Sequence, residues 1–580
     1  MTTTPTAPTG LRSAQLRLLR GYAPLSVLLL AIALLTILIP SVAPEQKTVT
    51  VRERVTSAGS GTSTGTGAAA GRGAATAAGG AAGGTGGAGT TATGGTGAGS
   101  GSGAGTGVAT AGGKTSACSG QALQVPGDPY SPPCISFSGS NGGVTSPGVS
   151  GQTINLTYRF ATDAITTSQS VPGLSSITYN DSQADIERTV KDLVTYFNNH
   201  FQFYGRKLNV NFYNGQGSFG NELQGMGQAQ ATADSITAAQ QLHAFADVTG
   251  QTSLLYIKAL AQQKVIGLGL NFLSQATMAS LAPYAWGPAT DCNATVNTAI
   301  DIAAKQLANQ NAAYAGGALK GQPRKFAILA PDNPDYQACV NQGLVTAKAD
   351  GVTISDNLQY QLNIATATSQ VDSIIAKLAD DNITTVILLT DPVAPLFLTD
   401  RAAQQDYDPE WMELGTGTDL DIVGQIYDQS EWAHAFGISF NGAAVPEQAS
   451  LSYQAYRTVA NDTPALSIIS GVYEALDELS IGIQMAGPDL TPTTFEQGMR
   501  AYPGSQPNNA NAQMGTWKFP PNEFNPVQDS WLVYWDGVKT SPFNGKPGAY
   551  VVGSPRYPLD QYPRTPLTAP AGFPFAASGG

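Results

Sequence analysis

Two kinds of hydrophobic pattern alternate along most of the chain after residue 150. Short runs rich in β-branched and aromatic residues, such as TINLTYRF at residues 153–160, have the length and composition of strands. Longer stretches carry apolar residues three and four positions apart, as at residues 185–201, where Ile186 and Val190 would share one helix face. Regular alternation of the two predicts an α/β protein with parallel sheets covered by helices on both faces.

The alternation occurs as two series separated by a spacer at residues 284–294. In the first series the pattern predicts strands at 153–160, 208–214, 243–248 and 264–269, and helices at 185–201, 222–238 and 253–263. In the second it predicts strands at 324–330, 352–360, 384–390, 411–415 and 421–427, and helices at 299–310, 336–351, 371–382, 394–405 and 466–487.

Two such series predict two α/β lobes. We assign residues 151–288 to the N-lobe, 289–430 to the C-lobe and 431–537 to crossover elements shared by both. Residues 538–580 are rich in proline and are expected to form a tail that wraps the surface or frays. Because ligands of open α/β sheets sit beyond the carboxyl ends of the strands, the gap between the lobes is the expected site.

A long apolar stretch, APLSVLLLAIALLTILIPSV, occupies residues 23–42 and contains no charged residue. About 20 apolar residues are enough to cross a bilayer as a helix. Arg12, Arg17 and Arg20 precede the stretch, without any acidic residue among them. This bias predicts that residues 1–22 stay in the cytoplasm. We therefore expect a single-pass protein of the cytoplasmic membrane with its folded domain on the extracellular side.

A cleaved signal peptide is the alternative for the same stretch, since the sequence Ser41-Val42-Ala43 offers small residues where a signal peptidase cuts. Pro44, directly after that site, disfavours cleavage, and no cysteine follows that could carry a lipid. We favour an uncleaved signal anchor.

The next segment, residues 43–117, is predicted to be a flexible linker. Between residues 56 and 117 almost every residue is Gly, Ala, Ser or Thr. Such a segment lacks the large apolar side chains whose burial would offset the loss of chain entropy.

Cysteine usage agrees with a location outside the cell. The chain has four cysteines, no CxxC pair and three histidines, so no metal site is predicted. In an oxidising compartment two disulfides are the simpler interpretation. We expect Cys118 with Cys134 to close a lead-in loop over residues 118–150, and Cys292 with Cys339 to join two helices.

Charge and motifs exclude several classes of function. The net charge is −12, and the folded part has no cluster of Lys and Arg, which excludes a nucleic-acid partner. No GxSxG, HExxH, P-loop or GxGxxG-after-strand pattern occurs. His200, His243 and His434 have no obvious nucleophile partner. The sequence therefore predicts neither an enzyme nor a cofactor.

One strand end carries candidate binding residues. The stretch FAILAPDNPDYQACV, residues 326–340, is an apolar run that breaks on Asp-Asn-Pro-Asp and resumes with a helical pattern. It predicts a buried strand that delivers Asp332 and Tyr336 to the edge of a sheet, where they would contact a solute. Ordinary packing is the alternative for Tyr336, and Asp335 is expected to cap the following helix.

Four stretches together resemble a known family. They are GVTSPGVSGQTINLTYRF (143–160), YFNNHFQFYGRKLNVNFYNGQ (196–216), PRKFAILAPDNPDYQACV (323–340) and NITTVILLTDPVAPLFLTDRAAQQDYDPEWMELG (382–415). In this order they resemble the type I periplasmic-binding fold, in its branched-chain amino-acid (Leu/Ile/Val-type) substrate-binding branch, over about residues 143–537. The resemblance implies two doubly wound lobes joined by a hinge, which clamp a small solute and usually hand it to an ABC permease.

The resemblance also implies a ligand site on the first lobe. The family holds a ligand carboxylate with hydroxyl and main-chain N–H groups at a strand-to-helix turn, which corresponds here to Thr249, Gly250, Thr252 and Ser253. Such N–H groups suit an anion, and a plain N-cap is the alternative for Thr252 or Ser253. The family's next loop offers another hydroxyl. Here it reads GLNFLS and is more apolar, with Asn271 as the candidate contact.

On the second lobe the resemblance and the strand ends imply four ligand contacts: Asp332, Tyr336, Asp391 and Tyr427. Formation of a turn is the alternative for Asp391. The family's acid that grips an ammonium group would fall at residues 415–418, where this chain has no carboxylate, although Asp419 follows closely.

These observations predict a membrane-tethered extracytoplasmic protein that clamps a small polar solute, an amino acid or a related molecule, and delivers it to an ABC permease. One alternative is a ligand-sensing or scaffold ectodomain without a transport role. Its signal would need a partner protein, because residues 1–22 are too short for a signalling domain. A second alternative is a cleft that no longer binds anything.

Overall fold

The computed structural model describes residues 118, 121–163, 179, 181–250, 252–269, 272–505 and 512–565, with only the backbone at 364 and 365. All of them belong to one compact unit, residues 99–580. Among these residues no helix is long and apolar enough to cross a bilayer. The predicted span at residues 23–42 and the predicted linker at residues 43–117 lie outside the described residues.

The first sheet of the described chain has five strands, all parallel, in the order β2-β1-β3-β4-β5. The strands are β1 (Thr153–Phe160), β2 (Lys207–Asn214), β3 (Ala246–Gly250), β4 (Ile266–Gly269) and β5 (Ala285–Trp286). The helices between them are α2 (Gln183–His200), α3 (Phe219–Leu223), α4 (Gln228–Ile236) with its π-helical extension η3 (Thr237–Gln241), α5 (Leu254–Gln262) and α6 (Gln275–Ser280). We call this sheet and its helices the first lobe.

The second sheet has eight strands in the described residues, in the order β12-β11-β10-β9-β8-β6-β7, with β13 beside β11. The parallel strands are β6 (Phe326–Pro331), β7 (Ile354–Tyr360), β8 (Thr385–Leu388), β9 (Glu410–Glu413) and β10 (Ala435–Ser439). The antiparallel strands are β11 (Asp529–Thr540), β12 (Pro547–Val552) and β13 (Tyr557–Pro558). This sheet is therefore mixed, whereas the sequence predicted a parallel one.

Helices and short helical turns accompany the second sheet, and together they form the second lobe. They are α7 (Cys292–Ile302) with its π-helical extension η4 (Ala303–Leu307), η5 (Gly317–Leu319), α8 (Pro334–Ala349), α9 (Ile364–Asp380), α10 (Ala394–Gln404), α11 (Asp421–Gly424), α12 (Gln429–Trp432) and η6 (Glu447–Ala449).

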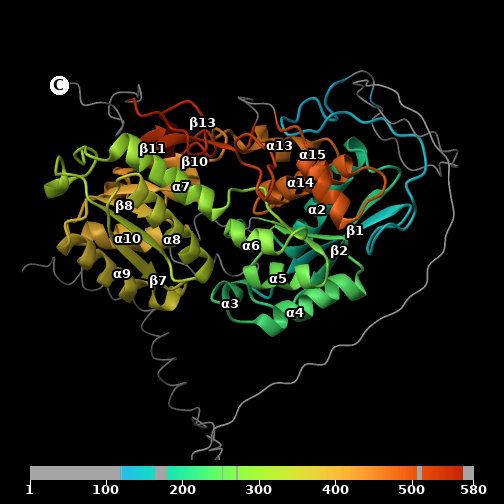
Figure 1. Ribbon diagram of the computed structural model, residues 1–580, viewed down its shortest axis with the longest axis horizontal. Coiled ribbons are helices and arrows are strands. Elements are labelled where there is room, and N and C mark those ends of the chain that lie inside the picture. The colour runs from blue at the N-terminus through green and yellow to red at the C-terminus, as the bar shows by residue number, and fades with distance from the viewer. Residues whose placement is uncertain are drawn as a thin grey trace, which may run out of the picture. The chain divides into compact units, whose positions relative to one another are not determined.

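The chain crosses between the sheets more than once. It passes from the first sheet to the second after β5 and returns after β10 to form α13 (Leu451–Arg457), α14 (Ile469–Ala486) and α15 (Pro492–Ala501). α14, in orange in Figure 1, packs against α2, β3 and β4, and α15 packs against α14. The chain then passes back to β11. Segments far apart in the sequence therefore connect the two lobes.

Residues 421–427, predicted as a strand, instead begin with the helical turn α11. A short apolar run fits a strand or a buried helix equally well by its pattern alone. Three tertiary contacts favour the helical turn. Asp421 accepts hydrogen bonds from the Ser541 hydroxyl (2.6 Å) and the Tyr550 amide (2.8 Å). Gly424 lies against the ring of Trp535, where a Cβ atom would come within 2.5 Å of a ring carbon.

The C-terminal segment after residue 537 also differs from the prediction. It was expected to wrap the surface or fray, yet β12 and β13 both pair with β11. The run GAYVV within Pro547–Val552 supplies the apolar and β-branched residues that a strand needs. Residues 566–580 lie outside the described residues.

Both predicted disulfides are confirmed. Cys118 is bonded to Cys134, and Cys292 at the start of α7 is bonded to Cys339 on α8. The second bond joins two helices of the second lobe, as expected.

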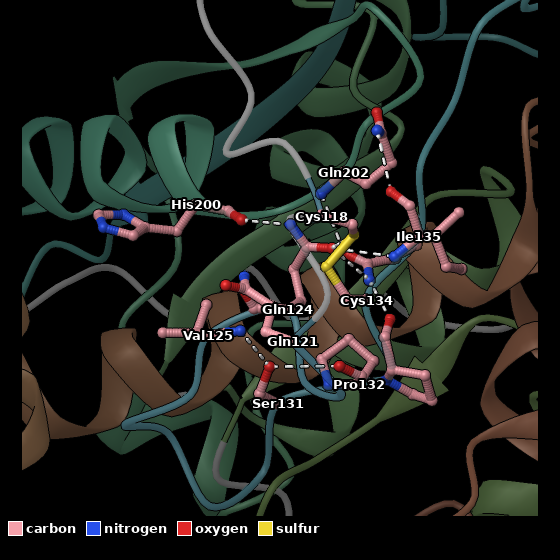
Figure 2. The surroundings of a disulfide bond; sticks show 12 residues. Cys118, Gln121, Gln124, Val125, Ser131, Pro132, Cys134, Ile135, His200 and Gln202 are labelled. Atoms are coloured by element: carbon pink, nitrogen blue, oxygen red, sulfur yellow. Dashed lines mark hydrogen bonds between the residues drawn. A yellow bond between two sulfur atoms is a disulfide. The ribbon is translucent and has the colours of Figure 1, made fainter.

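The loop closed by the first disulfide is fastened to the first lobe (Figure 2). The side-chain amide of Gln124 donates to the main-chain oxygen of His200 at the end of α2 (2.8 Å). Its carbonyl oxygen accepts from the Ile135 amide (3.3 Å) and from the side chain of Gln484 on α14 (3.1 Å). The lead-in loop is thus part of the folded lobe.

Candidate functional site

A cavity of about 350 Å³ lies between segments of the two lobes. The first lobe lines it with residues 223–226, where α3 ends. The second lobe lines it with residues 332–334, which follow β6, and residues 361–363, which follow β7. The carboxyl ends of parallel strands are the places where open α/β sheets bind ligands. The volume falls within the range of small-molecule sites, about 300–1,000 Å³.

The lining of this cavity is polar and acidic on one side. Asp332 is exposed, Gln224, Asn333 and Gln361 line the same cavity with side-chain amides, and Met226 is 51% exposed. None of the lining residues is a Lys or an Arg. Such a cavity suits a neutral polar or positively charged group, because a bound anion would meet no cation there.

Beside the cavity the two lobes touch through Tyr336. Its ring lies 5.3 Å, centroid to centroid, from the ring of Phe272 in the first lobe. Burial, and then the charge of Asp391, raises the pKa of Tyr336, so its hydroxyl stays protonated at neutral pH. The half-buried ring packs on the main core, which is the packing role left open by the sequence. Ligand contact by Tyr336 stays a prediction.

Asp335 does not cap α8 as expected. The N-cap is Asn333, whose side chain accepts from the Asp335 amide (2.9 Å). The carboxylate of Asp335 instead accepts from the hydroxyls of Thr277 (2.6 Å) and Ser274 (3.4 Å) at the start of α6. Because Asn333 caps α8, the carboxylate of Asp335 is available for these bonds to α6. Asp335 therefore links the second lobe to the first.

The first-lobe turn holds its Thr249 hydroxyl in internal hydrogen bonds. Thr249 donates to Asp247 (2.5 Å) and accepts from the Arg159 amide (2.8 Å). Gly250 adopts a φ of +80°, a conformation that favours glycine, and its strand pairs with β4 at Gly269. The side chain of Thr249 therefore forms its hydrogen bonds within the first lobe.

Ser253 is the N-cap of α5, the alternative role that the sequence left open. Its hydroxyl accepts from the Tyr256 amide (3.0 Å) and donates to Glu222 (2.5 Å). Thr252 is buried beside it, at 7% exposure. Asn271 lies outside the described residues. Ligand contacts at this turn stay a prediction, and the main-chain N–H groups are the atoms that would make them.

Asp391 forms a turn at the start of α10. One of its oxygens accepts from the amides of Val393 (2.8 Å) and Ala394 (3.2 Å), and the other accepts from the Tyr360 hydroxyl (2.5 Å). Tyr427 is 3% exposed and donates to the main-chain oxygen of Pro392 (2.7 Å). Neither residue lines the cavity of 350 Å³, and their contact with a solute stays a prediction.

Asp419, the nearest carboxylate to the expected acid position, is buried in the second lobe. It accepts from the Ser439 hydroxyl (2.5 Å) and the side-chain amide of Asn441 (2.9 Å). Burial raises the pKa of Asp419 despite these bonds, which makes it a poor partner for an ammonium group in this arrangement.

A buried charge network supports the first-lobe wall of the cavity. Arg159 in β1 is 1% exposed and donates to Glu222 (2.8 and 3.0 Å) and Asp234 (3.2 Å). Its guanidinium lies 3.7 Å from the ring centroid of Tyr256. Glu222 directly precedes residues 223–226, so this network positions the wall.

Sequence reasoning missed this network. Burial lowers the pKa of Arg159, but the hydrogen bonds that Arg159 donates to Glu222, together with the neighbouring charges, raise it overall, so the side chain stays charged. The available signal was an arginine near the end of the apolar strand TINLTYRF, since a charge in a buried strand needs a buried partner.

Comparison with known proteins found no matching protein-family model and no match among curated proteins. Solved structures do match. An ABC transporter substrate-binding protein from Aeropyrum pernix is 12% identical with a TM-score of 0.48, and the match covers 70% of this chain and 96% of that chain. A fatty acid ABC transporter substrate-binding protein from Thermomonospora curvata is 13% identical with a TM-score of 0.48, covering 73% and 98%.

A third solved structure is an ABC transporter substrate-binding protein from Desulfitobacterium hafniense in complex with Leu. It is 13% identical with a TM-score of 0.44, and the match covers 69% of this chain and 99% of that chain. All three are substrate-binding proteins. At this level of similarity we argue the function from the contacts of this chain alone.

Proposed function

We propose that this chain is an extracytoplasmic solute-binding protein that holds a small polar solute between its two lobes. The observation that carries the proposal is the cavity of about 350 Å³, which both lobes line and which lies at the carboxyl ends of β6 and β7. A solute that touches both lobes would favour their closed arrangement, because it would bind that arrangement more tightly than an open one.

The lining indicates the class of solute. Asp332 offers a carboxylate without a cation in the cavity, so it would pair with an ammonium group or a hydroxyl. The surrounding amides would supply both donors and acceptors. For an amino acid, the carboxylate would need the main-chain N–H groups at the N-terminus of α5.

We further propose that residues 23–42 anchor the protein in the cytoplasmic membrane and that residues 43–117 tether the lobes outside it. The apolar length and the preceding arginines support this topology. A tether would raise the effective concentration of the loaded protein near an ABC permease in the same membrane.

Native mass spectrometry of the purified chain with a pool of amino acids and related polar metabolites would identify a retained solute. Its affinity would then be measured for the wild type and for Asp332→Asn. We expect the substitution to weaken binding by about 1.5–3 kcal/mol, the contribution of a charged hydrogen bond.

Asp380→Asn is the matched control, since this exposed carboxylate at the end of α9 lies outside the cavity. Its affinity should equal that of the wild type. An unchanged affinity for Asp332→Asn would place the solute elsewhere, and the absence of any retained solute would support a cleft that no longer binds.

A further inference from the structure

A second and larger cavity, of about 680 Å³, shares no lining residue with the first. Its walls come from residues within 290–297 at the start of α7, within the segment 516–529 that leads from α15 to β11, and within 556–561. Gln275 at the start of α6 completes the lining. The cavity therefore lies where the chain passes between the lobes.

The walls of this hinge-side cavity carry an excess of negative charge. Asp291, Glu523, Asp529 and Asp560 line it, together with a single cation, Arg556. Arg556 is paired with Asp529 (2.7 Å). Within the described part of the chain, the other three carboxyl groups have no ion-pair partner.

The three unpaired carboxyl groups are fixed in place and influence one another. Asp291 caps α7 and accepts from the Ala294 amide (2.9 Å), and Asp560 accepts from the Thr298 hydroxyl (3.2 Å). Burial raises the pKa of Asp291 to about 6, and the charges of Glu523 and Asp560 add to the rise. A cation placed among them would relieve this repulsion.

A side-chain amide oxygen offers a further acceptor on the same walls. Asn525 lines the cavity and is 4% exposed. The side-chain amide of Asn525 donates to the main-chain oxygens of Gly287 (3.1 Å) and Ala289 (2.7 Å), which leaves its carbonyl oxygen as an acceptor.

We propose that the hinge-side cavity binds a linear organic polycation, a diamine or polyamine with separated ammonium groups. Each ammonium group carries N–H donors and positive charge, which match the carboxylates and the side-chain carbonyl oxygen of Asn525. A single metal ion fits less well, because no group of three His, Cys, Asp or Glu in the described residues is placed to hold one. The ammonium groups spread along a polyamine match the carboxyl groups spread around the cavity.

Isothermal titration calorimetry of the full-length chain with spermidine at low ionic strength tests this proposal. Asp291→Asn keeps a good N-cap residue, and Asp560→Asn keeps a residue type that tolerates the φ of +58° found there. We expect each substitution to weaken spermidine binding about tenfold, as for the loss of one charged hydrogen bond. The double variant should weaken it further.

Two control variants separate this site from the other cavity. Asp406→Asn alters an exposed carboxylate with a φ of +51° outside the cavity, and its spermidine affinity should equal that of the wild type. Asp332→Asn removes the carboxylate of the cavity of about 350 Å³, and spermidine bound in the hinge-side cavity should keep its affinity in this variant. The hinge-side site is therefore testable whether or not the proposed solute function is correct.

Several outcomes would overturn the proposal: no binding of spermidine by the wild type, equal affinity in the wild type and the double variant, loss of binding in Asp332→Asn alone, or displacement of spermidine by an equal concentration of Mg²⁺. Thermal unfolding checks that the variants are folded. If the double variant does not fold, Glu523→Gln serves in its place, because the Glu523 carboxylate is half-buried and accepts only from Gln528 (3.1 Å) among the hydrogen bonds of the described residues.

Discussion

Two groups of buried carboxyl groups in the same chain differ in whether a cation reaches them. In the first lobe, Glu222 and Asp234 both accept hydrogen bonds from Arg159 and form ion pairs with it at 2.8 and 3.2 Å. On α14, both carboxyl oxygens of Asp477 and of Glu478 lack a hydrogen-bond partner within the described residues. Each group is less than a tenth exposed, so burial alone does not distinguish them.

Burial favours the protonated form of the α14 carboxyl groups. Burial raises the pKa of Glu474 to about 8 and that of Asp128, which reaches α14 from the lead-in loop, to about 6. Burial also raises the pKa values of Asp477 and Glu478 far above their usual range. The two groups differ because the fold brings a cation to the first and, among the described residues, none to the second.

Removing the cation should produce the largest effect. Arg159→Met leaves Glu222 and Asp234 buried without a positive partner, and we expect it to lower the free energy of unfolding by about 3–5 kcal/mol. Chemical denaturation at neutral pH measures this. Arg188→Met is the control: its ion pairs with Asp185 and Asp462 are more than a third exposed on both sides, and such pairs contribute little. Equal effects of the two substitutions would contradict the role of Arg159.

The pH dependence of stability should reveal the α14 group. Because its pKa values are raised on folding, the folded state binds more protons than the unfolded state above about pH 4.5, so stability must fall as the pH rises. Glu474 alone, with a folded pKa of about 8, should lower the free energy of unfolding by roughly 3 kcal/mol between about pH 5 and 8. Denaturation curves across that range measure the slope.

The slope of the unfolding free energy against pH reflects how many more protons the folded state binds than the unfolded state. Glu474→Gln should lower that difference by about one proton, because an amide does not titrate. A wild-type stability that stays constant or rises over the range would mean that the α14 carboxyl groups are ionised in the folded protein.

An Asp→Asn substitution in each group, at Asp234 and at Asp477, should give a smaller difference in the free energy of unfolding. Asp234 accepts from the amides of Gln216 (2.8 Å) and Gly217 (3.0 Å) besides Arg159, so Asp234→Asn should cost about 1–2 kcal/mol. Asp477→Asn, measured near pH 5, should change stability by less than about 0.5 kcal/mol, since one neutral group replaces another of similar shape. A cost at Asp477 as large as that at Asp234 would indicate a charged Asp477.

The order of helices and strands could be predicted because hydrophobic periodicity is local. The strand at residues 153–160 coincides with β1, and the helix predicted at residues 394–405 ends one residue beyond α10. Residues 421–427 could not be predicted, because their turn depends on contacts with Ser541 and Trp535, more than a hundred positions away. The antiparallel strands β11 and β12 were missed for the same reason, since strand direction depends on the partner strand.

The candidate site was predictable only in part. Asp332 could be placed at a strand end from the sequence, and it lines the first cavity. The hydroxyls of Thr249 and Ser253 donate hydrogen bonds to Asp247 and Glu222 and so do not point to an open binding surface. Nothing in the sequence indicates the bond between Ser253 and Glu222, which are 31 positions apart.

By itself the sequence determined that strands and helices alternate, that they form two series, and that Asp332 follows a buried strand, because each of these depends on neighbours along the chain. The charge of the buried carboxyl groups was decided by tertiary structure alone. Arg159 lies 63 positions from Glu222 and 75 from Asp234, yet the fold brings all three within hydrogen-bond distance, whereas it brings no cation to Asp477 among the described residues. Ionisation depends on distance in space, which local sequence does not specify.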